Sequence, residues 1–235
     1  LNLAWRCSVR IDQMLDYEPE MLQLMHDSGC RELAIGGESG SKRIMDLIQK
    51  EIVPQDVITC SRRVLEFGMH PVYPIMVGFP DEKNWYDTKL TLRHMAELKK
   101  LAPDADMSYF YYTPFPDTPL YPWAHEHGLP QAERLSDFLP YSPYDPEMPW
   151  IDERLARLLK MATRFYFKFA IPDAAMRERL AHHKLRHPLR LMAALSRWRV
   201  NKMRWGFPFE YKLARFMKDT VIGKWGWFGR LKEIL

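Results

Sequence analysis

Four short apolar runs, each followed by an amphipathic stretch, occupy the first 128 residues of the chain. The runs either alternate apolar and polar positions or stay apolar for a few residues, as β-strands do. The predicted strands are residues 4–9, 31–35, 72–77 and 106–112. Because a helical pattern separates each strand from the next, the sequence predicts βαβ units with a parallel sheet, which is an α/β fold.

The helical stretches repeat their apolar positions every three to four residues. Gly29 and Gly68 stand just after two of them, where a left-handed residue often ends a helix. Right-handed crossovers would give either an open doubly wound sheet or part of a β/α barrel, and periodicity alone does not choose between these. The predicted helices of this half are residues 20–27, 41–49, 54–67, 84–101 and 120–127.

The pattern changes after Gly128. A stretch rich in Pro, Tyr and Ser predicts a long irregular connection, and a strong helix with one apolar stripe follows it at residues 150–169. Further helices are predicted around residues 173–183, 188–205 and 209–221. The predicted organisation is therefore an α/β domain at 1–128, a linker at 129–149 and an α-helical region at 150–235.

The net charge of +4 hides an asymmetry. Residues 174–235 contain 15 Lys and Arg against 4 Asp and Glu, or +11, and the preceding residues contain 19 against 26, or −7. Aromatic residues lie among the cations of this basic region: Trp205, Phe207, Phe209, Trp225, Trp227 and Phe228. Three interpretations are open: a surface for membrane lipids, a surface for nucleic acid, or a helical cap that packs its aromatics and solvates its charges.

Composition favours a packed protein, because 47% of the residues are hydrophobic. The first residue is Leu1 rather than Met, which suggests a fragment or a processed product. No basic segment leads into an apolar run, and the longest uncharged stretch, residues 67–80, is too short to span a bilayer. We expect a cytoplasmic protein, with peripheral membrane contact as an option.

The three cysteines (Cys7, Cys30 and Cys60) have no CxxC spacing, so we expect reduced, mostly buried thiols and no metal site.

The segment GGESGS, residues 36–41, lies at the junction between a predicted strand and a helix. Ligands of parallel α/β folds bind at this edge of the sheet. The Glu38 carboxylate and a neighbouring hydroxyl can hydrogen-bond a ribose, and the free N–H groups of the new helix can hold an anion. A polar turn with Ser39 or Ser41 as helix cap explains the same residues.

Longer stretches resemble the radical S-adenosylmethionine (SAM) enzymes, and most closely the class with a cobalamin-binding domain. CRELAIGGESGSKRIMDLIQK is similar to the SAM-binding fourth strand and helix of that family. Three further stretches resemble its third, fifth and sixth strands with their loops, in the same order: WRCSVRID with EPEMLQLMHDSGC, VYPIMVGFPDEKNWYDT and YFYYTPFPDTPLYPWAHEHG. LARLLKMATRFYFKF is typical of the helices that follow. The resemblance implies strands 3–6 of a partial, TIM-like β/α barrel.

The resemblance also implies residue roles. Glu38 and Ser39 match positions that face the ribose and amino-acid part of SAM, and Lys50 matches the basic residue that pairs with the SAM carboxylate. Arg10 matches a SAM or substrate contact, although an ordinary surface salt bridge explains Arg10 and Lys50 equally well. Tyr112 and Thr113 match the region that lines the adenine. For Tyr112 and its aromatic neighbours in the strand, a place in the core is the alternative.

This sequence departs from the family in three places. The CxxxCxxC loop that holds the [4Fe–4S] cluster is absent, so the cluster ligands, and any cobalamin domain, would lie outside this chain. Asp81 and Asp117 replace two turn glycines. The implied function is part of a radical SAM enzyme that methylates, cyclises or rearranges its substrate. Its partners would be the missing N-terminal half and an electron-donor protein. A non-catalytic remnant that binds a nucleotide or a membrane surface is the alternative.

Overall fold

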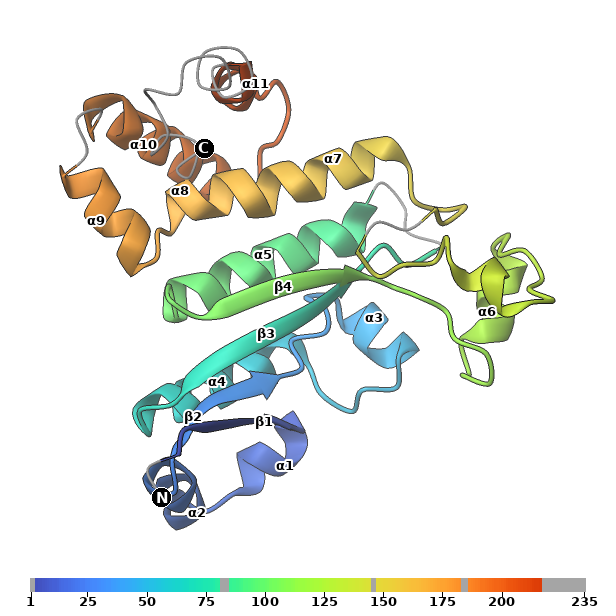
Figure 1. Cartoon of the computed structure of the whole chain (residues 1–235), viewed down its shortest axis with the longest axis horizontal. Helices are drawn as coiled ribbons and strands as arrows, with labels where there is room; N and C mark the ends of the chain where they lie inside the picture. The colour runs from blue at the N-terminus through green and yellow to red at the C-terminus, as the bar shows by residue number, and fades with distance from the viewer. Residues whose placement is uncertain (1–2, 81–84, 145–146, 183–185, 217–235) are drawn as a thin grey trace. The chain divides into compact units, whose positions relative to one another are not determined.

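A parallel four-stranded sheet organises the first half of the chain (Figure 1). The computed structural model describes residues 3–80, 85–144, 147–182 and 186–216. The strands are β1 (Trp5–Val9), β2 (Cys30–Ile35), β3 (His70–Val77) and β4 (Asp106–Tyr111), and they lie side by side in the order β1-β2-β3-β4. All three pairings are parallel, which confirms the predicted α/β class.

Helices connect consecutive strands, as predicted. Helix α4 packs on β2 and β3 and also contacts α5. Helix α1 was not predicted, and α3 ends two residues earlier than predicted because Gln49 has a left-handed φ of 56°. The helices of this half are α1 (Ile11–Asp16), α2 (Pro19–Asp27), α3 (Lys42–Leu47), α4 (Pro54–Glu66), α5 (Tyr86–Leu101) and α6 (Tyr121–Glu126).

The core follows the alternation of the strands. Along β3 every second residue is buried, including Tyr73, Ile75 and Val77. Two of the three free cysteines are also buried, and burial raises the pKa of Cys30 to about 11 and that of Cys60 to about 12. Both therefore remain thiols at neutral pH, as expected for structural cysteines.

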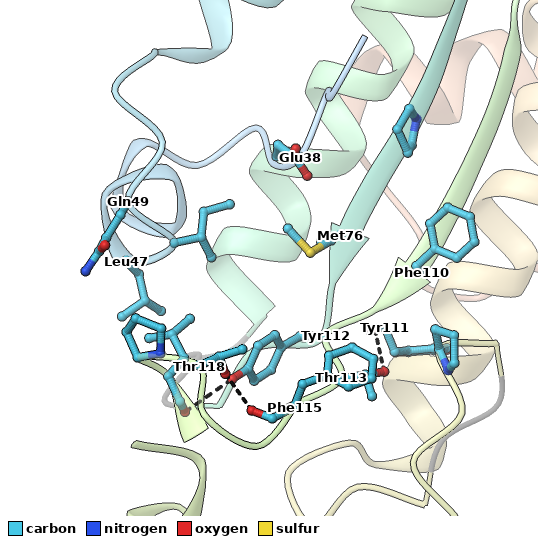
Figure 2. Close-up of a pocket in the computed structure, with 15 residues that line it drawn as sticks. Glu38, Leu47, Gln49, Met76, Phe110, Tyr111, Tyr112, Thr113, Phe115 and Thr118 are labelled. Atoms are coloured by element: carbon cyan, nitrogen blue, oxygen red, sulfur yellow. Dashed lines mark hydrogen bonds between the residues drawn. The ribbon is translucent and has the colours of Figure 1, made fainter. Parts of the chain in front are cut away.

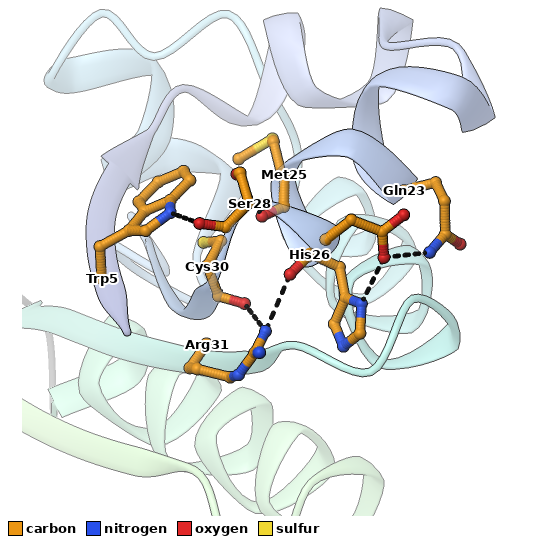
Figure 3. Close-up of polar contacts among 8 residues, drawn as sticks. Trp5, Gln23, Met25, His26, Ser28, Cys30 and Arg31 are labelled. Carbon is orange, nitrogen blue, oxygen red and sulfur yellow. Dashed lines mark hydrogen bonds and ion pairs between the residues drawn. The ribbon is translucent and has the colours of Figure 1, made fainter. Parts of the chain in front are cut away.

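Several polar contacts surround the turn between α2 and β2 (Figure 3). The Trp5 indole N–H donates to the Ser28 carbonyl at 3.0 Å, and Arg31 donates to the carbonyls of His26 at 2.9 Å and Cys30 at 3.0 Å. Gly29 itself has a φ of 103°, in the left-handed region that glycine favours. The predicted helix end at this glycine is confirmed.

The second half of the chain is helical. Contacts divide the molecule into two compact units, Leu1–Leu155 and Ala156–Leu235. The helix that starts as α7 (Glu153–Met161) continues through a π-helical turn (Ala162–Phe167) into α8 (Lys168–Ala170). It is followed by α9 (Ala174–His182), α10 (Arg186–Lys202) and α11 (Phe209–Phe216). Some residues named in the sequence analysis lie outside the described residues. They are Asp81, at a predicted turn, and three aromatics of the basic region, Trp225, Trp227 and Phe228. The end of the last predicted helix lies outside them as well.

None of the helices in the described ranges is long and apolar enough to cross a membrane.

One buried ion pair holds the end of this helical unit together. The Nε and Nη2 groups of Arg199 donate to the two carboxylate oxygens of Glu210, and the two side chains are only 6% and 3% exposed. Arg199 also donates to the carbonyls of Arg204, Gly206 and Phe207 at 2.9–3.1 Å, so every arm of the guanidinium is used.

We predict that Arg199→Ala lowers the free energy of unfolding by about 3–5 kcal/mol, because it leaves the Glu210 carboxylate buried without its partner. Urea unfolding followed by circular dichroism measures this. The matched control is Arg197→Ala, which removes an exposed arginine from the same helix and should cost less than about 0.5 kcal/mol. Equal losses in the two variants would contradict the structural role of the pair.

Candidate functional site

A cavity of about 650 Å³ opens at the carboxyl ends of β2, β3 and β4 (Figure 2). Parallel strands bring their carboxyl ends to one edge of the sheet, so loops from distant parts of the sequence meet there. The volume suits a nucleotide-sized ligand. The wall is mainly apolar and contains Leu47, Ile48, Pro74, Met76, Phe110, Tyr111, Tyr112, Phe115, Pro119, Leu120 and Pro143, with the polar side chains of Glu38, Gln49, Thr113 and Thr118.

Tyr112 is both a wall residue and a core residue. Its ring stacks on Phe79, with ring centres 4.8 Å apart and planes 17° apart. Its hydroxyl donates to the Leu120 carbonyl at 3.3 Å, and burial raises the pKa of Tyr112 to about 12. The ring is therefore neutral and fixed. Thr113 lies next to it and donates to the Tyr111 carbonyl at 3.2 Å.

A smaller, polar cavity of about 90 Å³ lies at the carboxyl ends of β1 and β2. Its charged wall residues are Arg10, Asp12, Glu38, Lys50 and Glu51. The Lys50 ammonium lies 2.9 Å from the Glu38 carboxylate, whose side chain is 15% exposed. Arg10 binds Asp12 at 2.7 Å, and this hydrogen bond lowers the pKa of Asp12. Each predicted cation thus has a carboxylate partner, and Glu38 lines both cavities.

The backbone of Glu38 continues the sheet beyond the end of β2. Its carbonyl accepts from the Met76 N–H at 2.6 Å, and Glu38 forms a parallel bridge with Ile75. A Cβ at Gly37 would lie 2.5 Å from the Ile75 side chain, so glycine permits this close approach. Glu38 has a φ of 39°, which is uncommon for a residue with a side chain and is often found at functional sites.

Two side chains of α5 fix the residues that follow Glu38. The Thr91 hydroxyl accepts from the Gly40 N–H at 3.1 Å and lies 2.9 Å from the Ser39 hydroxyl. The buried Asp87 carboxylate accepts from the Ser41 hydroxyl and from Arg43, the latter at 2.6 Å. We call Asp87 and Thr91 the α5 clamp.

The α5 clamp explains where the predicted serines lie. Ser39 is 2% exposed, bonds to Thr91 and lines neither cavity, so its side chain does not join those of Glu38 and Lys50. Ser41 is the N-cap of α3, as the alternative interpretation of this segment proposed. Sequence reasoning missed the clamp itself. The sequence shows only that Asp87, Thr91 and His94 share one face of the predicted helix, at i, i+4 and i+7, and not which segment this face contacts.

His94 lies beneath the same loop. A Cβ at Gly40 would be 2.7 Å from the His94 Cβ and 2.4 Å from the Leu90 carbonyl, so the loop and helix touch at this glycine. Burial lowers the pKa of His94 to about 4, and its Nε2 has no hydrogen-bond partner among the described residues. The histidine is therefore neutral in the folded chain at neutral pH.

Within the described ranges, no group of three or more His, Cys, Asp or Glu side chains could hold a metal ion. The three cysteines are not gathered into such a group, and a [4Fe–4S] cluster needs several cysteine thiolates around one site. Asp117 has a φ of 61°, which lies in the left-handed region that glycine favours and that aspartate tolerates better than most residues.

The fold and cavities define an α/β protein whose candidate ligand site lies at the carboxyl edge of a parallel sheet. No protein-family model matches the chain. The chain is 27% identical over 190 residues to an uncharacterized methyltransferase of Pyrococcus horikoshii, and the match covers 78% of this chain and 38% of that protein. The chain thus spans well under half the length of this relative.

Three solved structures align with parts of the chain. Elp3 of Methanocaldococcus infernus covers 53% of this chain and 28% of its own, with 18% identity and a TM-score of 0.41. The radical SAM methyltransferase TsrM of Kitasatospora setae, with tryptophan and a SAM analogue, covers 53% of this chain and 23% of its own, with 18% identity and a TM-score of 0.41. The structure of TsrM with cobalamin and a [4Fe–4S] cluster covers 86% of this chain and 45% of its own, with 15% identity and a TM-score of 0.44. TM-scores below 0.5 do not by themselves establish a common fold.

The α5 clamp predicts a stability effect at the loop. Thr91→Val keeps the shape of the side chain but leaves the Gly40 N–H and the Ser39 hydroxyl without their partner, so we expect a loss of about 1–3 kcal/mol. Thermal unfolding measures it. Thr59→Val on α4 is the control, because that exposed hydroxyl donates only to a carbonyl of its own helix. A Thr91 variant as stable as the control would mean that the clamp does not hold the loop.

The lowered pKa of His94 predicts a dependence of stability on pH. In the unfolded chain an ordinary histidine takes up a proton near pH 6.5, whereas the folded chain takes it up only near pH 4. Protonation therefore favours the unfolded chain as the pH falls from 6.5 to 4, at a cost of about 3 kcal/mol. Urea unfolding at several pH values should show this loss in the wild type and a smaller one in His94→Met. Parallel curves would show that His94 titrates normally in the fold.

Proposed function

We propose that this chain is the SAM-binding part of a SAM-dependent methyltransferase of the radical SAM type. The observation that carries the proposal is the position of Glu38, at the carboxyl edge of the sheet and in the wall of both cavities. The similarity to an uncharacterized methyltransferase supports the reaction class. The chain spans 38% of that relative, so in this proposal the activity would require further domains like those of the relative.

The two cavities suit the two halves of SAM. The apolar cavity beside Tyr112 and Thr113 would take the adenine, and the Glu38 carboxylate would accept hydrogen bonds from the ribose hydroxyls. The polar cavity would take the amino-acid end, which carries one positive and one negative charge. Lys50 and Arg10 offer cations for its carboxylate, and the carboxylates that pair with them offer acceptors for its ammonium group.

The sequential strand order supports part of a β/α barrel. In an open doubly wound sheet the strand order reverses at a switch point, whereas barrel strands follow one another around the axis. The order β1-β2-β3-β4 contains no reversal. We therefore assign these strands to positions 3–6 of a partial barrel, whose other strands, cluster ligands and cobalamin domain would belong to the rest of the longer protein. An electron-donor protein would be its partner.

This chain's own residues would bind and orient the cofactor. An electron from the [4Fe–4S] cluster and methyl transfer through cobalamin would be the chemistry of those groups. The apolar wall around Tyr112 would contact the adenine, and the stacking of Tyr112 on Phe79 holds this wall in place. The α5 clamp keeps Glu38 in place by fixing the residues that follow it.

Isothermal titration of SAM into the chain tests the proposal. Glu38→Gln and Lys50→Glu should each weaken binding by about tenfold or more, because each removes a charge-assisted hydrogen bond. Lys42→Glu is the matched control, since Lys42 is an exposed lysine on α3 that pairs with Asp46 and lines neither cavity. If all three variants bind as the wild type does, Glu38 and Lys50 are not SAM ligands.

A further inference from the structure

The exposed charges of α10 and α11 have a single sign. Between Arg186 and Phe216 the only carboxylate is Glu210, and it is buried against Arg199. Apart from this pair, the charged side chains of the segment are exposed lysines and arginines. They include Arg186, Arg190, Arg197, Lys202, Arg204 and Lys212. The ion pair inside the unit thus removes the segment's one negative charge from its surface.

Large apolar side chains are exposed on the same two helices and on the loop between them. On α11, Phe209, Leu213 and Phe216 are spaced i, i+4 and i+7, so they form one stripe, while Glu210 and Ala214 occupy the buried side. A helix of a globular protein normally turns such a stripe toward the core. The exposed apolar residues of the segment are Leu191, Trp198, Phe207, Phe209, Leu213 and Phe216.

Arg199 links the end of α10 to the loop before α11. Its guanidinium lies 5.9 Å from the centre of the Trp198 ring and donates to the Phe207 carbonyl at 2.9 Å. The rings of Phe207 and Phe209 have centres 6.5 Å apart. The Arg199 side chain therefore joins the end of α10 to the loop that carries Phe207, and cations flank the exposed apolar residues in the sequence. We call residues 186–216 with these exposed side chains the α10–α11 surface.

We propose that the α10–α11 surface binds the head-group region of an anionic lipid bilayer. Exposed Leu, Phe and Trp beside Lys and Arg are the composition of helices that lie in the membrane interface, where apolar side chains enter the acyl boundary and cations meet lipid phosphates. A single-stranded nucleic acid would use the aromatic rings by stacking but would gain little from Leu191 and Leu213. A helical cap that packs its aromatics against the protein would bury these rings, whereas the rings of this surface are exposed. The proposal is independent of SAM binding.

Co-sedimentation of the whole chain with vesicles tests this surface. The probe is phosphatidylcholine vesicles containing about 30% phosphatidylglycerol, compared with pure phosphatidylcholine. The wild type should bind the anionic vesicles and release them as salt is raised. Arg190→Glu with Arg197→Glu should weaken binding by about tenfold or more, since each basic residue near an anionic surface contributes about 1 kcal/mol.

Two further variants keep the outcome decisive. Arg62→Glu with Arg93→Glu reverses two exposed arginines of α4 and α5, gives the same net charge and should bind as the wild type does. Leu191→Gln with Leu213→Gln leaves the charge unchanged but should still lower vesicle binding several-fold. Absence of binding, equal losses in both charge-reversed variants, or tighter binding to single-stranded RNA than to vesicles would each overturn the proposal. Circular dichroism confirms that each variant is folded.

Discussion

The α5 clamp holds the loop after β2 at a fixed position on the sheet, and the candidate site depends on that loop. Thr91 accepts from the Gly40 backbone, and the buried Asp87 carboxylate accepts from the Ser41 hydroxyl and from Arg43. Buried polar groups are costly unless they are paired, so the loop and the helix each satisfy what the other would leave unpaired. Glu38 precedes these contacts directly, and its own carbonyl is bound to β3. The carboxylate is therefore positioned from both sides.

The electrostatics of the polar cavity allow partners to be exchanged. Lys50 is 46% exposed, and Arg10 is largely exposed as well. An ion pair whose cation is exposed to water is weak, so replacing one carboxylate partner of the cation with a ligand carboxylate costs little. The apolar cavity differs, because Tyr112 is buried, neutral and stacked. One end of the site is thus adaptable and the other rigid, which suits a ligand with a flexible charged end and a flat ring.

Local patterns in the sequence predicted the sheet and most helices of the first unit, because alternation and helical spacing depend on near neighbours. Helix α1 was missed because its six residues bury only Ile11 and Met14, too few to show a period. The placement of Ser39 could not be predicted for a different reason. The hydroxyl that binds it, on Thr91, lies 52 residues away in the sequence, and no local pattern reports such a contact. Glu38 and Lys50 were grouped by resemblance, and the structure brings their side chains within 2.9 Å.

In the helical unit, the structure shows which charged side chains are buried and which are exposed to solvent. The composition of the basic region shows an excess of cations but not which of them face solvent. A buried guanidinium is stable only when its donors are all satisfied, and Arg199 achieves this by binding Glu210 and three carbonyls of the loop between α10 and α11. These hydrogen bonds fix the loop, which carries the exposed Phe207. Within residues 186–216, the ion pair thus buries the one carboxylate, and the same arginine fixes the loop that carries an exposed aromatic residue among the remaining cations.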